Sequence, residues 1–139
     1  MEKQKAAHLA ELALKARERA YAPYSGYTVG AALLAKDGRI FTGCNVENAS
    51  YPAGICAERN AVFHAVSEGC TSFEAIAVAG GKMYKTPGNY TMPCGICRQV
   101  LSEFCGPEFP VIVVNGDGDI REHKLGELLP YAFLSDQLR

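Results

Sequence analysis

The chain has 139 residues, of which 21% are charged and 48% are hydrophobic, and its formal net charge is −1 at pH 7. A chain of this length is near the usual size of a single domain and can bury a hydrophobic core, so we expect one domain over residues 1–139. The basic and acidic residues are interspersed, which excludes the concentrated positive charge typical of proteins that bind DNA, RNA or an anionic membrane. A small substrate with little or no charge fits this composition better.

The six cysteines could form three disulfides, but other features favour a reducing cytoplasm. The chain contains a CxxC pair, its size is moderate, and no apolar segment leads it. Its first 20 residues are charged and follow a helical pattern, unlike a signal peptide. No apolar run approaches the roughly 18 residues that a membrane span needs. We therefore expect a cytoplasmic protein with no membrane partner.

The first half of the chain predicts a helix followed by a hairpin of strands. From Lys3 to Ala20 apolar residues recur at helical spacing, with charged residues on the other face. Proline and glycine in the segment 22–26 (APYSG) end this helix. Residues 27–35 and 39–47 have strand patterns, and the Asp-Gly pair between them is a strong hairpin signal. These two strands should pair in an antiparallel manner.

The remaining elements alternate between helix and strand. A helix is expected at 55–68, with an inward stripe of Ala57, Ala61, Val62, Ala65 and Val66. A polar loop at 48–54 precedes it, and the elements that follow it are a strand at 73–79, a long loop at 80–92, a helix at 94–105, strands at 111–115 and 120–124, and a short helix at 125–129. This order predicts an α/β fold, a three-layer α/β/α sandwich around a mixed five-stranded sheet.

Two short segments, CAER at 56–59 and PCGICR at 93–98, bring three cysteines to a spacing typical of metal sites. Structural zinc sites take four protein ligands, whereas catalytic sites take three and leave one position open. Cys56, Cys94 and Cys97 therefore predict a catalytic site with one zinc per chain. Both segments lie at the N-termini of predicted helices, where free amides and the helix dipole favour thiolates, at the carboxyl edge of the strands.

A fourth protein ligand would make the site structural instead. Cys105 and His64 lie eight residues beyond the nearest predicted ligand, which is about 12 Å along a helix and too far for a metal bond. The spacing of Cys44 does not exclude it. The alternatives to an open site are therefore a closed structural zinc site and a thioredoxin-like redox pair at Cys94 and Cys97.

Two charged residues follow the first predicted ligand. Glu58 would be a poor ligand so close to Cys56, and a carboxylate near an activated water can transfer its proton. Arg59 can donate to the thiolates and offset their negative charge. The simpler interpretations are a glutamate that only complements the helix dipole and an arginine that is merely solvated.

These residues match the signature of zinc-dependent nucleobase deaminases, a metal ligand two residues before a glutamate and a later P-C-x-x-C. Because the first ligand is Cys56 and not histidine, the chain resembles the small, homotetrameric cytidine deaminases. The resemblance extends over almost the whole length. It includes the segments 21–25 (YAPYS), 29–33 (VGAAL), 44–49 (CNVENA), 65–69 (AVSEG) and 127–130 (ELLP).

The resemblance implies hydrolytic deamination of cytidine and 2′-deoxycytidine to the uridines, with release of ammonia, in pyrimidine salvage. Asn45 and Glu47 correspond to a pair that binds the ribose, and Ala57 to a residue whose backbone amide meets the base carbonyl. Phe133 corresponds to an aromatic residue that reaches the base from a neighbouring subunit. Tyr27 stands where the family usually has phenylalanine against the base or sugar, and its hydroxyl needs a partner if it is buried.

The tail 128–134 (LLPYAFL) is strongly apolar although it ends five residues before the C-terminus. It could pack on the core of its own chain. The resemblance instead implies a homotetramer with active sites shared between subunits.

Other functions are less well supported by the residues. The nearest rival is deamination of a related aminopyrimidine nucleoside such as blasticidin S, but Asn45 and Glu47 favour ordinary nucleosides. A tRNA or DNA deaminase would need a basic strip for the phosphate backbone. A zinc-stabilised binding module without catalysis would not need Glu58, and a fourth protein ligand would reveal it.

Overall fold

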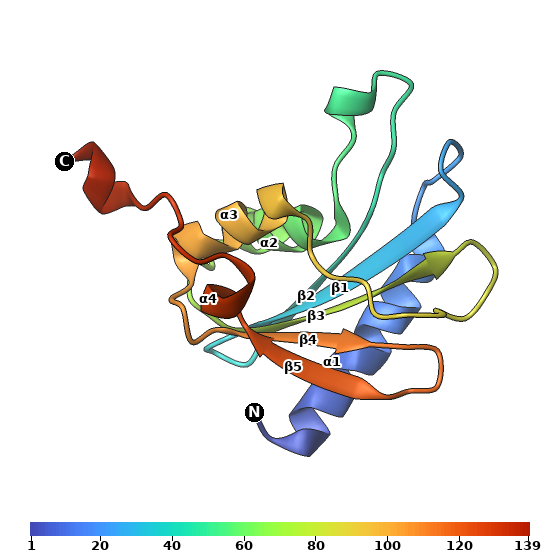
Figure 1. The fold of residues 1–139 in the computed structure, drawn as a ribbon, viewed down its shortest axis with the longest axis horizontal. Helices are drawn as coiled ribbons and strands as arrows, with labels where there is room; N and C mark the ends of the chain where they lie inside the picture. The colour runs from blue at the N-terminus through green and yellow to red at the C-terminus, as the bar shows by residue number, and fades with distance from the viewer.

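The computed structural model describes all residues from Met1 to Arg139. One sheet has the strand order β2-β1-β3-β4-β5, and helices cover both of its faces (Figure 1). The strands are β1 (Tyr27–Ala35), β2 (Ile40–Cys44), β3 (Phe73–Lys82), β4 (Pro110–Val114) and β5 (Ile120–Lys124). The helices are α1 (Lys3–Ala16), α2 (Ala57–Ser67), α3 (Gly95–Phe104) and α4 (Leu125–Leu128), with short 3₁₀ turns η1 (Arg17–Arg19), η2 (Tyr51–Ala53) and η3 (Ser135–Leu138). The predicted mixed sheet with flanking helices is confirmed.

The direction of the strands brings the ends of three of them to one edge of the sheet. Strand β1 pairs antiparallel with both β2 and β3, while β3 pairs parallel with β4. Strands β2, β3 and β4 therefore run in the same direction, and their carboxyl ends meet at the same edge. The predicted hairpin turns at Asp37 and Gly38, where Gly38 has φ of 95° and the Asp37 carboxylate accepts the Arg39 amide at 3.0 Å.

The sheet separates two hydrophobic cores, because alternate residues of a strand point to opposite faces. One core joins Leu33, Ile76 and Val111 to α2 and α3, and the other joins Ala32, Ala77 and Ile112 to α1. In Figure 1, α1 lies behind the sheet, whereas α2 and α3 lie together on its other side. The layers are therefore helix, sheet and helix.

Two glycines allow the helices to approach the sheet closely. A Cβ atom at Gly43 of β2 would lie 2.5 Å from the carbonyl oxygen of Ala57 and 2.5 Å from the amide nitrogen of Ala61. A Cβ atom at Gly30 of β1 would lie 2.1 Å from the carbonyl oxygen of Ala13 in α1. Since real Cβ atoms do not make such contacts, glycine at these positions sets the height of each helix above the sheet. Gly43 thereby fixes the first turn of α2, which follows Cys56.

Several boundaries and one burial prediction differ from the sequence expectation. Val66 was expected to face inward but is 38% exposed, because the inward stripe of α2 is narrow and already filled by alanine and valine. Strand β3 extends to Lys82, since Tyr27 pairs with Lys82 and prolongs the ladder. Strand β2 ends at Cys44, beyond which Val46 makes only isolated bridges to Tyr21 and Ile55. No helix has the length and apolar composition needed to cross a membrane.

The predicted first helix ends four residues early, at Ala16, and continues as a 3₁₀ turn. Arg17 in this turn is buried and points into the protein. Its guanidinium donates to the carbonyl oxygens of Lys82 at 2.9 Å and Lys85 at 2.8 Å, and its Nε donates to the Thr28 hydroxyl at 3.2 Å. Its positive charge is therefore stabilised by uncharged acceptors, and it fastens the start of the segment 83–92 to β1 and η1.

Candidate active site

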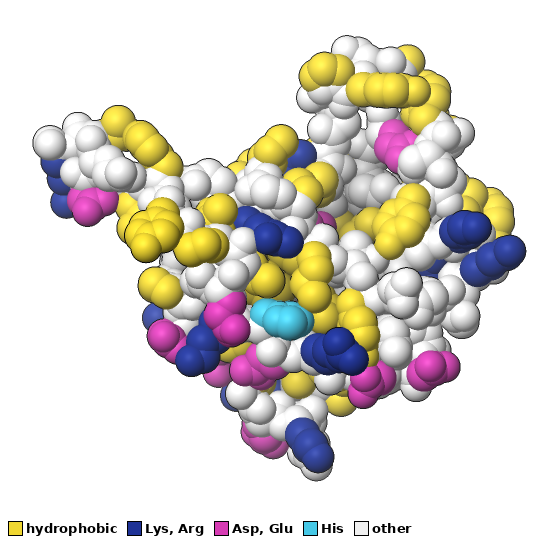
Figure 2. Space-filling view, in the orientation of Figure 1, with side chains coloured by type: hydrophobic (Ala, Val, Ile, Leu, Met, Phe, Trp, Pro, Cys, Tyr) yellow, Lys and Arg dark blue, Asp and Glu magenta, His cyan; other side chains and the backbone are white.

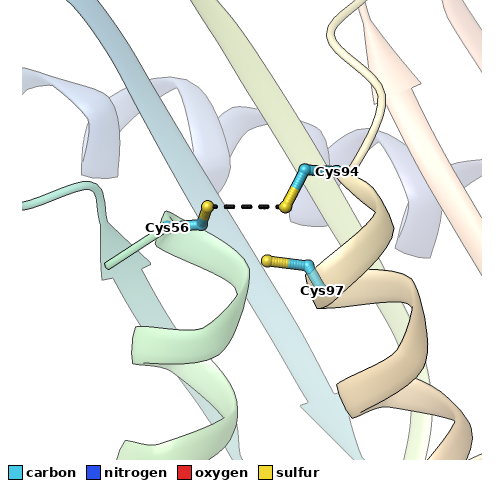
Figure 3. Close-up of side chains that lie close together, drawn as sticks. All are labelled: Cys56, Cys94 and Cys97. Atoms are coloured by element: carbon cyan, nitrogen blue, oxygen red, sulfur yellow. Dashed lines mark hydrogen bonds between the residues drawn. The ribbon is translucent and has the colours of Figure 1, made fainter. Parts of the chain in front are cut away.

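Three cysteine side chains meet between the first turns of α2 and α3. Cys56 is the N-cap of α2, Cys94 is the N-cap of α3, and Cys97 lies in the first turn of α3. Their sulfur atoms lie within 4.8 Å of one another and point toward a common centre (Figure 3). All three are free thiols. The two helix starts are neighbours because both follow strands whose carboxyl ends share one edge of the sheet.

The geometry of the sulfur atoms fits zinc. The Sγ atoms of Cys56 and Cys94 are 3.6 Å apart. Tetrahedral coordination with Zn–S bonds of about 2.3 Å places sulfur ligands about 3.8 Å apart. The group consists of these three thiols and includes no other histidine, cysteine, aspartate or glutamate. Cys44 is not part of it, and the carbonyl oxygen of Cys44 instead accepts a hydrogen bond from Asn60 at 2.7 Å.

The thiols are arranged so that one of them ionises first. Hydrogen bonds from the Cys97 thiol and from Arg59 lower the pKa of Cys56 to about 5. The pKa of Cys97 is raised, chiefly because its thiol donates that hydrogen bond to Cys56. Nη2 of Arg59 lies 3.6 Å from Sγ of Cys56, and this contact raises the pKa of Arg59. Binding of a metal must displace the remaining thiol protons.

Glu58 is the acidic residue next to Cys56 in the sequence. It follows Cys56 in the first turn of α2, and only 4% of its surface is exposed. Burial raises the pKa of its carboxyl group above the ordinary value, because the charged form loses its hydration. A buried carboxyl group with a raised pKa holds a proton more readily than an ordinary carboxylate and can both accept and return one.

A cavity of about 530 Å³ opens beside the cysteines and Glu58. This volume is in the usual range for sites that bind small molecules. Predicted residues that line it are Asn45, Glu47, Cys56, Ala57, Glu58, Arg59 and Cys94. Cys97 is fully buried behind them. The structure thus gathers most of the predicted site residues around one cavity.

Asn45 and Glu47 also line this cavity, and both side chains are hydrogen-bonded to the backbone. Oδ1 of Asn45 accepts the Val29 amide at 2.8 Å, and its Nδ2 donates to the Tyr27 carbonyl at 2.9 Å. An asparagine amide retains a further N–H and a further lone pair. The side chain can therefore still bind a ligand.

The Glu47 carboxylate is likewise hydrogen-bonded to the backbone while it lines the cavity. It accepts the backbone amides of Tyr24 at 3.0 Å and Ser25 at 3.1 Å, together with a short hydrogen bond from the Ser25 hydroxyl. The Ser25 hydrogen bonds lower the pKa of Glu47, so this carboxylate stays ionised across the neutral range. Ser25 was not predicted as a site residue, although it lies in the YAPYS segment that carried the family resemblance.

Besides the buried Cys97, two of the predicted residues, Tyr27 and Phe133, do not line the cavity. The Tyr27 hydroxyl is hydrogen-bonded to Oγ1 of Thr91, and Thr91 rather than Tyr27 faces the cavity, next to Met92. Phe133 lies in the C-terminal tail, and 56% of its surface is exposed. The C-terminal tail and the segment between β2 and α2, which contains η2, project from the body of the molecule, and both carry hydrophobic side chains (Figures 1 and 2). Thr91 and Met92 were missed because the segment 83–92 has no periodic pattern.

Comparison with known proteins identifies the family. Residues 3–113 match the family described as "Cytidine and deoxycytidylate deaminase zinc-binding region". A cytidine deaminase of Sporosarcina psychrophila is 52% identical over 124 residues, which cover 89% of this chain and 88% of that protein. A cytidine deaminase of Halalkalibacterium halodurans is 48% identical over 126 residues, covering 91% and 92%. The crystal structure of cytidine deaminase from Burkholderia pseudomallei has a TM-score of 0.82 and 48% identity, covering 96% of this chain and 100% of that one. The chain, with its cluster of three cysteines, therefore belongs to the zinc-binding cytidine deaminase family.

Proposed function

We propose that the protein catalyses the zinc-dependent hydrolytic deamination of cytidine and 2′-deoxycytidine to uridine and 2′-deoxyuridine, with release of ammonia, in pyrimidine salvage. The observation that carries this proposal is the buried Glu58 beside three convergent thiols at the wall of a cavity that can hold a nucleoside. Since the six cysteines are unpaired, we also propose that it works in a reducing cytoplasm.

Cys56, Cys94 and Cys97 would hold one zinc per chain. Three thiolates are a donor set that zinc prefers, and the helix starts supply unpaired amides near them. When bound, zinc would supply Lewis-acid activation of a water molecule. Arg59 donates to the Cys56 sulfur, so its charge offsets part of the negative charge of the thiolates.

Glu58 would move the protons of the reaction. Its carboxylate takes a proton from the attacking water and gives it to N3 of the cytosine ring, which makes C4 ready for attack. After the C4–O bond has formed, the carboxylate takes the second water proton and gives it to the amino nitrogen. The C4–N4 bond then breaks as the C4–O double bond forms, and ammonia is released together with uridine, which keeps the proton on N3. The buried position of Glu58 suits this shuttle because a single carboxyl can serve each transfer.

Asn45, Glu47 and Ala57 would hold the nucleoside. Asn45 and Glu47 line the cavity and keep unused hydrogen-bonding capacity for the sugar hydroxyls. Ala57 also lines the cavity, at the first position of α2. The first amides of a helix have no partner within the helix, so that of Ala57 can donate to the base carbonyl at O2.

Replacing Glu47 with glutamine should raise KM for cytidine by about 10- to 100-fold, because a charged hydrogen bond to the sugar stabilises the complex by roughly 1.5–3 kcal/mol. Glutamine keeps an oxygen for the amides of Tyr24 and Ser25, so the loop should stay in place. Steady-state kinetics on the parent and on Glu47→Gln measure the difference. Glu103→Gln, an exposed glutamate on α3, is the matched control. Equal KM values in the parent and Glu47→Gln would contradict the sugar contact.

We further propose a homotetramer in which Phe133 of one subunit closes the pocket of another. Two large apolar side chains on the outer faces of α2 and α3 support an interface, since Phe63 is 47% and Ile96 is 62% exposed. The tail is also held in a defined direction. Nε2 of Gln99 donates to the Phe133 carbonyl at 2.6 Å, and the Phe133 amide donates to Oε1 of Gln99 at 3.3 Å. This pair of bonds leaves the Phe133 ring free for a neighbour.

Subunit mixing tests the shared site. Phe133→Ala and Glu58→Gln subunits should each be nearly inactive alone. When they are refolded together, part of the parental activity should return, because some sites combine an intact Glu58 with a neighbour's intact Phe133. The control mixes Phe133→Ala with the double variant Phe133→Ala/Glu58→Gln, in which no such site can form. Hybrids that form without regaining activity would exclude a role of Phe133 across the interface.

The proposed reaction can be observed with purified protein and cytidine. The cytidine absorbance band should disappear while uridine and ammonia appear in equal amounts. Free cytosine should be a poor substrate, because it lacks the sugar that Asn45 and Glu47 are proposed to bind. A parallel assay with blasticidin S tests the nearest alternative, deamination of a related aminopyrimidine nucleoside. Turnover of blasticidin S without turnover of cytidine would overturn the proposed substrate.

A further inference from the structure

Tyr27 connects two groups of cavity-lining residues that are distant in sequence. Its backbone contacts the sugar-side group, since its amide donates to the Ser25 hydroxyl at 3.0 Å and its carbonyl accepts from Asn45 at 2.9 Å. Its side-chain hydroxyl reaches the other group and bonds Oγ1 of Thr91 at 2.5 Å. Thr91 is followed by Met92 and then by Pro93 and Cys94. One residue thus links the proposed sugar site to the segment that enters the metal site.

Thr91 is held tightly where it faces the cavity. Its side chain packs against Gly80 of β3, where a Cβ atom would lie 2.6 Å from Oγ1 and 3.0 Å from Cβ of Thr91. Glycine at 80 therefore makes the space that Thr91 occupies. Either hydroxyl could donate this bond, and because a phenol is a stronger hydrogen-bond donor than an aliphatic alcohol, we assign Tyr27 as the donor. Thr91 then keeps its own proton. Thr91 can then donate to an acceptor in the cavity that it lines.

The rest of the segment 83–92 is fixed by other contacts. Arg17 binds its start through the carbonyl oxygens of Lys82 and Lys85. Near its end, the Tyr90 hydroxyl bonds the Asp119 carboxylate, and the Arg121 guanidinium lies 4.5 Å from the centre of the Tyr90 ring. Loss of the bond between Tyr27 and Thr91 should therefore change the orientation of one hydroxyl without releasing the segment.

We propose that Tyr27 and Thr91 form a positioning pair, in which the Tyr27 hydroxyl orients the Thr91 hydroxyl to donate a hydrogen bond to an oxygen of the bound nucleoside. This inference rests on the proposed function. It assigns Thr91 as a further residue that determines nucleoside affinity. It also explains the use of tyrosine at position 27, because phenylalanine would keep the ring but could not orient Thr91.

Kinetics of Tyr27→Phe, Thr91→Val and the double variant test the pair. Each single variant should raise KM for cytidine about three- to tenfold, the effect of one neutral hydrogen bond. The turnover number kcat should stay within about twofold, because neither hydroxyl takes part in proton transfer. The double variant should be no worse than Thr91→Val, since Tyr27 acts through Thr91. Thr91→Ser keeps the hydroxyl and should stay close to the parent.

Tyr90→Phe is the matched control, because it removes a tyrosine hydroxyl bond from the same segment and neither Tyr90 nor its partner Asp119 lines the cavity; its KM should be unchanged. Zinc content and melting temperature should be the same in all variants. Unchanged KM values in Tyr27→Phe and Thr91→Val would overturn the inference, as would additive effects or a loss confined to kcat. A parent protein that does not deaminate cytidine would overturn the proposed function and this inference together. An active parent with unaffected variants would overturn the inference alone.

Discussion

Glu58→Gln should lower kcat for cytidine by at least about 10²- to 10⁴-fold, the range that general acid–base catalysis contributes. The loss should be at the upper end or beyond, because one carboxyl is proposed to serve several proton transfers and a neutral amide can serve none. Zinc content and melting temperature should be retained, since glutamine has nearly the same shape as glutamate. Removal of a buried carboxyl also removes its desolvation cost.

Steady-state assays of the purified parent and Glu58→Gln proteins compare kcat, and zinc is measured on the same samples. Glu68→Gln is a suitable control, because Glu68 lies at the other end of α2 and is exposed. It should behave like the parent. A Glu58→Gln protein that keeps a tenth of parental turnover would remove Glu58 from the mechanism.

Cys94→Ala should lose both zinc and activity. Two thiols remain in this variant, and the loss of one of three protein ligands leaves too few donors for a stable tetrahedral site. The helix start should be preserved, because alanine is tolerated where the Cys94 side chain makes no capping hydrogen bond. Elemental analysis after gel filtration, together with the cytidine assay, measures both losses on one preparation.

Cys44→Ala is the matched control for this variant. Cys44 lies near the end of β2 and outside the group of three sulfurs. Its replacement should leave about one zinc per chain and full turnover. Full zinc in Cys94→Ala would refute the assigned ligand set, and loss of zinc in Cys44→Ala would point to a closed, structural site.

Residue patterns predicted the parts of the fold that depend on local periodicity. Alternating and continuous apolar runs identified the five strands, and the Asp37-Gly38 turn identified the hairpin. The exposure of Val66 could not be predicted, because the width of the buried stripe on α2 depends on how closely β2 approaches at Gly43. The end of β3 at Lys82 was likewise missed, since it depends on pairing with Tyr27.

The candidate site also contains some residues that the sequence predicted and others that it could not predict. Glu58 and the three cysteines could be proposed because their chemistry follows from short spacings within two segments. The roles proposed for Asn45 and Glu47 came from family resemblance, and their bonds to Tyr27 and Ser25 were not visible in the sequence. Tyr27 and Thr91 are separated by 64 positions, and no local pattern relates two hydroxyls at that distance along the chain. Only the assembled sheet brings them together.

The central claim is that the three-cysteine site is catalytic and not merely structural. The most direct test removes zinc from the purified protein with a chelator, then follows cytidine turnover and circular dichroism on the same sample before and after zinc is returned. We predict that turnover falls in proportion to the zinc removed, that the spectrum of the folded sheet and helices persists, and that added zinc restores turnover. Full turnover in the zinc-free protein, or loss of turnover only when the fold itself is lost, would contradict the account.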